Sequence, residues 1–374
     1  MKNLVISNSL WNIYNFRYKL IIKLSKISEV IIYCNLDNKN KFLKKFPNNV
    51  KIKNLNYSSK SKSIIKNLKL IIFFLKIIKK ENPDNLFTFT LKPNLYLGIV
   101  NTFFRIPFFP TITGLGTAKN RGGFLFFFVA LLMKLSFKSS SKIFVHNIEE
   151  KRFLKKLGFP KSKTIITQGS GIDLRKYKKL KIIKKNHDKY LFVGRLIADK
   201  GIYELIEAFK HFNKFENKKS QLTLAVLVDE DNETSIKLKE LKNEIKGFKI
   251  IIKKNVKNIK KIYQSHECLI LPSYSEGMSR SIMEALSFAR PVICSNIHGC
   301  KEMVINGYNG FHFIPRSSKS IYKALTKFNN LTFKERLKFG NNSRILLKKN
   351  RFDEKYVVSH YLNQLKKNEL SSKT

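Results

Sequence analysis

The stretch at residues 269–292, LILPSYSEGMSRSIMEALSFARPV, contains the clearest strand–loop–helix pattern in the chain. Its apolar run, residues 269–271, precedes Pro272, which is typical of a buried strand that ends at a turn. A polar loop follows, and apolar residues then recur at helical spacing until Pro291. Parallel α/β sheets bind ligands beyond the carboxyl ends of their strands, so we expect a binding site in this loop.

The start of the predicted helix favours an anionic ligand. Ser279 or Ser281 is placed to cap the helix, whose N-terminus offers unpaired N–H groups and partial positive charge. A phosphate bound there would meet the backbone near Met278 and Ser279. Gly277 would let the ligand approach the backbone closely, because glycine has no side chain.

Two acidic residues flank this helix start. Glu276 lies in the loop and Glu284 follows eight residues later, which is roughly 12 Å of helical rise on nearly the same side. One elongated ligand could touch both carboxylates and place its phosphates between them. Chance pairs at this spacing are common, and the alternative is an exposed loop acid with a helix-surface acid.

The surrounding residues resemble the donor site of retaining glycosyltransferases of family 4, which have the GT-B fold. The resemblance rests on Pro-Ser-x-x-Glu-Gly, Met-Glu-Ala and Pro-Val in order, and it is strongest over residues 190–312. It implies that Glu276 contacts the donor sugar and helps to stabilise an oxocarbenium-like state, and that Glu284 hydrogen-bonds the ribose. It also implies that the reaction needs no metal ion or other cofactor.

A second loop supplies positive charge. Gly194, Arg195 and, five residues later, Lys200 follow a predicted strand at residues 190–193, and a predicted helix at 203–212 comes next. A guanidinium and an ammonium would stabilise the charge that develops on a diphosphate leaving group. A basic pair means little in so lysine-rich a chain, but Gly-Arg-Leu-x-x-Asp-Lys-Gly resembles the phosphate-binding pattern of the same family.

The first half of the chain alternates predicted strands with helices, which favours parallel βαβ units. The predicted strands are 4–6, 30–33, 50–52, 86–89, 107–113 and 143–145; the predicted helices are 13–24 and 64–78. Pro93 is expected to break the segment after the fourth strand.

The sequence Gly114-Leu115-Gly116 is not a dinucleotide fingerprint, because the third glycine of that motif would fall on Lys119.

The acceptor side is less well defined. Residues 13–17, IYNFR, resemble a helix start of transferases that extend lipid-linked sugars, so Arg17 is a candidate to face an anionic acceptor. The alternative is an exposed helix arginine. Thr113 and Gly114 stand where many members of the family carry His-Gly, and this sequence resembles the subgroup acting on undecaprenyl-diphosphate-linked acceptors. The first loop, residues 7–9, lacks the glycines usual in the family.

The composition indicates an anionic partner. The 374 residues include 73 Lys and Arg against 26 Asp and Glu, a formal net charge of +47. This charge favours membrane headgroups or nucleic acid as partners, or it reflects compositional bias.

The apolar run at residues 124–133 is too short to span a bilayer and suits a core or interfacial helix. The four scattered cysteines predict no metal site, and we expect no signal peptide.

Together these patterns predict an α/β protein of GT-B type, with two Rossmann-like domains whose parallel sheets face each other across a cleft. We expect an acceptor domain at residues 1–170, a nucleotide-sugar domain at 171–351 and a terminal helix at 352–374 that packs back on the first domain. The glycine-rich segment 168–173 would form the hinge.

The predicted activity is retaining transfer of a hexose or N-acetylhexosamine from a nucleotide-sugar to a lipid-diphosphate-linked saccharide. An N-acetylgalactosaminyltransferase, at the cytoplasmic face of the plasma membrane, is the most specific form of this prediction. The alternatives are a sugar-nucleotide epimerase of GT-B fold and a nucleic-acid-binding basic protein. Nucleic-acid binding would need a clustered basic face with aromatic platforms, whereas these lysines are spread along the chain.

Overall fold

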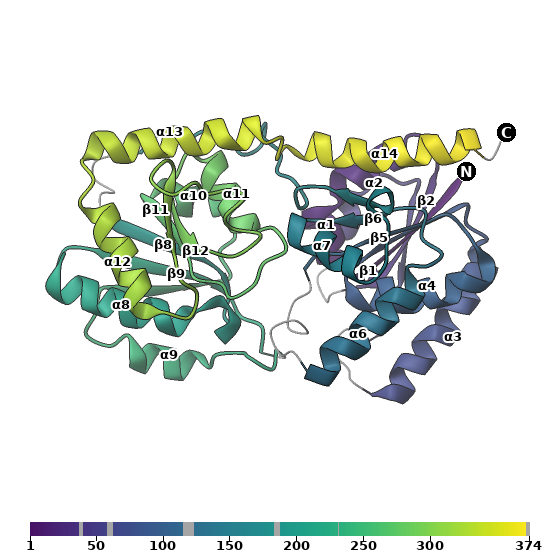
Figure 1. Ribbon diagram of the computed structural model, residues 1–374, viewed down its shortest axis with the longest axis horizontal. Helices are drawn as coiled ribbons and strands as arrows, with labels where there is room; N and C mark the ends of the chain where they lie inside the picture. The colour runs from purple at the N-terminus through teal and green to yellow at the C-terminus, as the bar shows by residue number, and fades with distance from the viewer. Residues whose placement is uncertain (37–39, 58–62, 115–122, 183–187, 231, 372–374) are drawn as a thin grey trace. The chain divides into compact units, whose positions relative to one another are not determined.

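The computed structural model describes residues 1–36, 40–57, 63–114, 123–182, 188–230 and 232–371 (Figure 1). The chain forms two compact units. Unit 1 comprises Met1–Gly171 and Glu354–Thr374, and unit 2 comprises Ile172–Asp353. Each unit has a parallel sheet covered by helices, and each is described by itself.

The sheet of unit 1 has seven strands in the order β3-β2-β1-β4-β5-β6-β7, and each neighbouring pair is parallel. The strands are β1 (Lys2–Ser9), β2 (Glu29–Asn35), β3 (Val50–Asn54), β4 (Asn85–Phe89), β5 (Phe108–Thr111), β6 (Ile143–Val145) and β7 (Thr164–Ile166). The direction of winding reverses between β1 and β4. This point is where doubly wound sheets leave a crevice for ligands.

Both faces of this sheet are buried by helices (Figure 1). Leu4 and Ile6 of β1 belong to the core beneath α3 (Ile64–Glu81), α4 (Leu91–Phe104) and α6 (Gly123–Ser136). Val5 points to the other face and packs in the core with α1 (Leu10–Phe16), α2 (Tyr18–Leu24) and α14 (Glu354–Ser371). This alternation follows from the two-residue side-chain period of a strand. The remaining described helices of unit 1 are η1 (Asn40–Lys45), α7 (Ile148–Lys156) and η2 (Lys161–Lys163).

The sheet of unit 2 has six parallel strands in the order β10-β9-β8-β11-β12-β13. These are β8 (Lys189–Arg195), β9 (Gln221–Leu227), β10 (Ile250–Lys254), β11 (Cys268–Leu271), β12 (Val292–Ser295) and β13 (Gly310–Phe313). Here the winding reverses between β8 and β11. The two loops singled out in the sequence therefore leave adjacent strands at the switch point.

Seven helical segments complete the described part of unit 2, and the six α-helices among them share one apolar core with its sheet. They are η4 (Ala198–Lys200), α8 (Ile202–Phe215), α9 (Leu238–Glu244), α10 (Ile259–Gln264), α11 (Arg280–Ser287), α12 (Ser318–Asn329) and α13 (Phe333–Lys349). Ser279 caps α11, because its Oγ accepts a hydrogen bond from the N–H of Ile282. α11 begins one residue after this cap, as the sequence pattern predicts.

Two expectations for unit 1 were wrong. The helix predicted over residues 13–24 is two helices, because the backbone at Arg17 departs from helical geometry between α1 and α2. Pro93 does not break the chain after β4. It lies in the first turn of α4, where a proline displaces no intrahelical hydrogen bond.

The chain crosses between the units twice, at neighbouring positions. Gly171 has φ +68°, and a Cβ atom there would lie 2.5 Å from the Cα of Glu354. Only glycine therefore suits this crossing. The backbone N–H of Ile172 donates to the carbonyl of Phe352 at 2.9 Å on the unit 2 side. Among the described residues, no helix has the length and apolarity that crossing a bilayer requires.

Candidate functional site

The loops after β8 and β11 bring an ammonium and a carboxylate together in unit 2. Lys200 Nζ lies 2.5 Å from Glu276 Oε1, and both side chains are largely buried. Ser273 Oγ also donates to Glu276 Oε1, at 2.7 Å. Oε2 of Glu276 accepts no hydrogen bond from the residues that the structure describes. One carboxylate oxygen is therefore anchored and the other is available to a ligand.

Two glycines allow three loops of unit 2 to pack closely around this contact. Gly201 follows Lys200 with φ +68°, and a Cβ atom there would lie 2.2 Å from the Pro272 carbonyl oxygen. Gly299 has φ +85°, and a Cβ atom would lie 2.6 Å from the carbonyl oxygen of Glu276. A Cβ atom at Gly201 would push the loops after β8 and β11 apart, and a Cβ atom at Gly299 would push the loop after β12 away from Glu276. The geometry around the Lys200–Glu276 contact therefore depends on both close approaches.

Arg195 lies at the end of β8, next to Gly194. Its Nη1 lies 3.1 Å from Asp229 Oδ2, and about half of its side chain is exposed. The sequence-predicted pair of cations is thus present on one strand-to-helix connection, with each cation near an acid. An exposed ion pair of this kind contributes little to stability, so Arg195 can exchange partners readily.

The start of α11 differs from our expectation in one respect. The backbone N–H of Ser279 donates to the carbonyl of Gly299 at 3.0 Å, so in this structure it is not available to a phosphate. The Gly299 carbonyl occupies the position because the loop at 296–300 packs against the loop at 276–279. The proposed contacts of Gly277 and Met278 stay predictions.

Glu284 lies inside α11, almost completely buried. Burial raises the pKa of its carboxyl group, and the Arg280 guanidinium, with Nε at 3.3 Å, opposes that shift. Arg280 Nη2 also donates to the hydroxyl of Tyr177 at 3.4 Å. Glu284 is therefore not the helix-surface acid of the alternative interpretation. It is held in a defined orientation by a cation one helical turn earlier.

In unit 1, Arg17 is not the exposed helix arginine that the sequence favoured. Its side chain is 3% exposed, because the break between α1 and α2 turns it toward the sheet. The guanidinium carbon lies 4.5 Å from the ring centroid of Phe89, and Nη2 lies 3.4 Å from His146 Nε2. Burial and the Arg17 charge lower the pKa of His146 to about 3, so its imidazole is neutral and can accept from Arg17.

Thr113 and Gly114 lie just beyond β5, and Gly114 has φ +122°. The residues that follow them, 115–122, lie outside the described part of the chain. The nearby Thr111 Oγ1 is 2.9 Å from the hydroxyl of Tyr361 on α14. The roles of Thr113 and Gly114 stay predictions.

Three residues of these sites were not predicted as functional. Ser273 positions Glu276, and the Pro-Ser-x-x-Glu pattern around it was a usable signal. Gly299 and His146 had no local signal, since each matters through a partner distant in sequence.

Comparisons with known proteins agree with this architecture. Residues 174–346 match the family described as "Glycosyl transferases group 1", and residues 6–147 match "Glycosyl transferase 4-like". The chain is 24% identical to the N,N'-diacetylbacillosaminyl-diphospho-undecaprenol alpha-1,3-N-acetylgalactosaminyltransferase of Campylobacter jejuni, over 94% of each chain. It is 26% identical to the UDP-Gal:alpha-D-GlcNAc-diphosphoundecaprenol alpha-1,3-galactosyltransferase of Escherichia coli, over 71% of each.

Solved structures show the same fold. The crystal structure of Anabaena HepE in complex with UDP and glucose aligns with a TM-score of 0.77 and 16% identity, over 98% of this chain and 99% of the other. The two parallel-sheet domains are therefore those of the GT-B fold, as the sequence predicted.

The buried His146 predicts a loss of stability in acid. Its pKa lies below the unfolded value of 6.5, so between pH 6.5 and about 3 only the unfolded chain takes up the proton. Stability from this group then falls as the pH falls, by at most about 1.4 kcal/mol per pH unit. We expect His146→Gln to flatten the decline in melting temperature between about pH 7 and about pH 5. The exposed His211→Gln control should keep the wild-type slope. An unchanged slope in His146→Gln would contradict this prediction.

Proposed function

Because the chain belongs to the GT-B glycosyltransferases, with a 4-like domain at residues 6–147 and a group 1 domain at 174–346, we propose a specific reaction for it. It transfers a hexose or N-acetylhexosamine from a UDP-linked donor to a saccharide carried on a lipid diphosphate, with retention of anomeric configuration. The observation that carries this proposal is the Lys200–Glu276 contact at the switch point of unit 2.

The unit 2 site supports a distinct role for each donor-side residue. Lys200 and Arg195 take the donor diphosphate, and Gly194 and Gly277 leave room for it beside the backbone. On binding, Lys200 exchanges the Glu276 carboxylate for phosphate oxygens. This exchange stabilises the negative charge that grows on the diphosphate as the bond to the sugar breaks. These two side chains supply the positive charge, so we propose that the reaction is independent of metal ions.

Glu276 acts on the sugar. Ser273 holds one of its carboxylate oxygens, and the other can face the positive charge that develops at the anomeric carbon. A carboxylate fixed before the reaction stabilises such charge without having to reorient. Glu284 accepts a hydrogen bond from the ribose, and Met278 contributes its backbone N–H to the diphosphate.

The acceptor proposal rests on different support. The similar Campylobacter jejuni and Escherichia coli enzymes are named for acceptors on diphospho-undecaprenol, at 24% and 26% identity. We assign Arg17, Thr113 and Gly114 to the acceptor side, because they lie near the carboxyl ends of the unit 1 strands. The product would be an extended lipid-linked saccharide for polysaccharide or glycan synthesis.

A lipid-linked acceptor requires contact with a membrane, and unit 1 has an apolar surface suited to it. α3, α4 and α6 lie side by side on one face of the sheet (Figure 1). Their most exposed apolar side chains form what we call the α3–α6 surface: Ile65, Leu68, Ile72, Phe103, Phe127, Phe128, Leu131 and Leu135. Exposed lysines flank it, including Lys66, Lys69, Lys134 and Lys138. We propose that this surface rests on the anionic cytoplasmic face of the plasma membrane.

Nucleotide binding is the first test of the proposed function. We expect UDP to raise the melting temperature of the full chain, because a ligand that binds only the folded state stabilises it. Lys200→Ala should weaken UDP binding about tenfold or more, since it removes a charge-assisted hydrogen bond. Lys237→Ala, at an exposed lysine of the same unit, should bind UDP normally. Stabilisation by an oligonucleotide but not by UDP or GDP would overturn the proposal.

Glu276→Gln tests the chemical step. The amide keeps the shape of the side chain but lacks the negative charge, so we expect transfer to fall by about a hundredfold or more while UDP still binds. The measurement is product formation from a panel of nucleotide-sugars and a short lipid-diphosphate acceptor. Glu240→Gln, at an exposed acid of the same unit, serves as the control. Near-normal turnover of Glu276→Gln would refute its role.

The membrane surface predicts a vesicle-binding defect. We expect Phe127→Ser combined with Leu131→Ser to lower binding to vesicles containing phosphatidylglycerol about tenfold or more, because two exposed apolar side chains are lost. Phe215→Ser removes a similarly exposed ring from unit 2 and should bind as the wild type does. Unchanged binding of the double variant would show that the α3–α6 surface does not contact the membrane.

A further inference from the structure

Arg17 is a buried cation without an ion-pair partner among the described residues. Burial lowers the pKa of its guanidinium, but from so high a value that it stays charged at neutral pH. Its Nε atom is buried and has no hydrogen-bond partner. The contacts that it does have are the Phe89 ring and the neutral imidazole of His146, at 3.4 Å. Neither of them carries a negative charge.

Two other buried arginines show how this chain normally satisfies such a group. Arg336 lies 2.9 Å from Glu267 and 3.6 Å from Asp188, so its charge is neutralised. Arg290 donates to the backbone carbonyls of Tyr263 and Lys181, although its Nη1 has no hydrogen-bond partner among the described residues. Arg17 has neither arrangement. Leaving a buried charge uncompensated is costly, so its retention indicates a partner that arrives from outside the chain.

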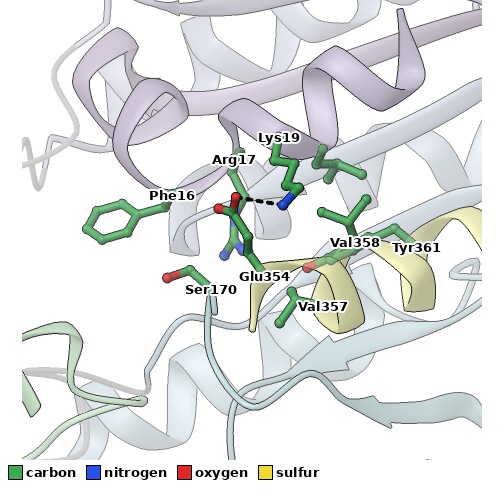
Figure 2. Close-up of a pocket in the computed structure, with 9 residues that line it drawn as sticks. Phe16, Arg17, Lys19, Ser170, Glu354, Val357, Val358 and Tyr361 are labelled. Atoms are coloured by element: carbon green, nitrogen blue, oxygen red, sulfur yellow. Dashed lines mark ion pairs between the residues drawn. The ribbon is translucent and has the colours of Figure 1, made fainter. Parts of the chain in front are cut away.

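A small cavity of about 10 Å³ in unit 1 borders Arg17, so a partner larger than a water molecule enters only if a lining side chain moves. It lies between the α1–α2 break, the segment before Gly171 and the first turns of α14, and its lining includes Lys19, Ser170, Glu354 and Tyr361. Figure 2 draws the side chains that line the cavity, with the ion pair between Lys19 and Glu354 marked. Lys19 Nζ lies 3.0 Å from Glu354 Oε1, and both side chains are about one-fifth exposed.

We propose that this cavity binds a phosphate group, with Arg17 as its buried counter-charge and Lys19 as its second cation. Lys19 would exchange the Glu354 carboxylate for phosphate oxygens as the ligand enters. The phosphate would belong to the diphosphate of the lipid-linked acceptor. This assignment of its source rests on the proposed function. Ser170 adds a hydroxyl at the same cavity.

The charge balance favours an anion. Arg17 and Lys19 contribute two positive charges and Glu354 one negative charge, so the lining is net positive. His146 is neutral, and the Tyr361 hydroxyl is held by Thr111 at 2.9 Å. Glu150 is not among the residues that line the cavity, and its Oε2 accepts the backbone N–H of His146 at 2.7 Å. A diphosphate carries more charge than a carboxylate and accepts a guanidinium through two oxygens, so it can compete with Glu354 for Lys19.

Calorimetric titration with inorganic pyrophosphate tests the site. In the wild-type chain we expect two binding events, one in each unit. Arg17→Met keeps the side-chain volume but not the charge, and should lose one event, with affinity falling about tenfold or more. Lys200→Ala should lose the other. If Arg17→Met titrates as the wild type does, the phosphate site is overturned.

Glu354→Gln separates binding from a structural role. Removing this carboxylate releases Lys19 and deletes the competing negative charge, so pyrophosphate should bind severalfold more tightly at the Arg17 site. A merely structural arginine would give no such gain, and an unchanged affinity would count against the proposal. Lys23→Gln, at an exposed lysine one turn further along α2, should leave both events unchanged.

Kinetics with a short lipid-diphosphate saccharide identify the source of the phosphate. We expect Arg17→Met to raise the acceptor KM about tenfold or more, with UDP affinity and binding to phosphatidylglycerol vesicles unchanged. A loss of vesicle binding with a normal acceptor KM would assign the site to a lipid headgroup and overturn the acceptor assignment. If UDP fails to bind while the Arg17-dependent pyrophosphate event persists, the proposed function fails and the phosphate site stands.

Discussion

The close packing of two loops at the switch point of unit 2 is the constraint on which the donor site depends. β8 and β11 are neighbours in the sheet, so the loops that leave their carboxyl ends meet although more than seventy residues separate them. Gly201 makes this contact possible because no Cβ atom fits beside the Pro272 carbonyl, and Gly299 lets the loop after β12 pack against the Glu276 carbonyl. The ammonium of Lys200 and the carboxylate of Glu276 then come within hydrogen-bonding distance. The strand order brings the two loops together, and the absence of a side chain at glycine permits the close approach of their backbones.

The sequence predicted this half of the molecule well because its chemistry is local. A strand that ends at Pro272, a polar loop and a capped helix can each be recognised over a few residues. Buried parallel strands are continuous apolar runs, which explains why the two-sheet architecture was also predictable. The sequence could not show the hydrogen bond that the Ser279 N–H donates to the Gly299 carbonyl, because that bond joins two loops that are separate in the sequence. Helix α13 was also missed, because no compact apolar run marks it.

Unit 1 was harder because its informative contacts cross long stretches of chain. The helical spacing after residue 13 fitted one continuous helix, and nothing local marks the break at Arg17. Its burial depends on Phe89 and His146, which lie 72 and 129 residues further along the chain. Side-chain type favours exposure for arginine, so a prediction from composition alone assigns it to the surface. The tertiary structure overrides that preference.

The net charge of +47 is therefore a poor guide to where anions bind. Most lysines are exposed, where water screens each charge and pairing with a nearby acid contributes little. A cation that the fold has removed from water is different, because the interior screens its field far less. In unit 2, the largely buried Lys200 lies beside Glu276, an acid that a ligand can displace. In unit 1, Arg17 lies against a ring and a neutral imidazole, which lessen the cost of burial without cancelling the charge. The strength of an anion site in this protein follows from burial and pairing, and only weakly from the number of basic residues nearby.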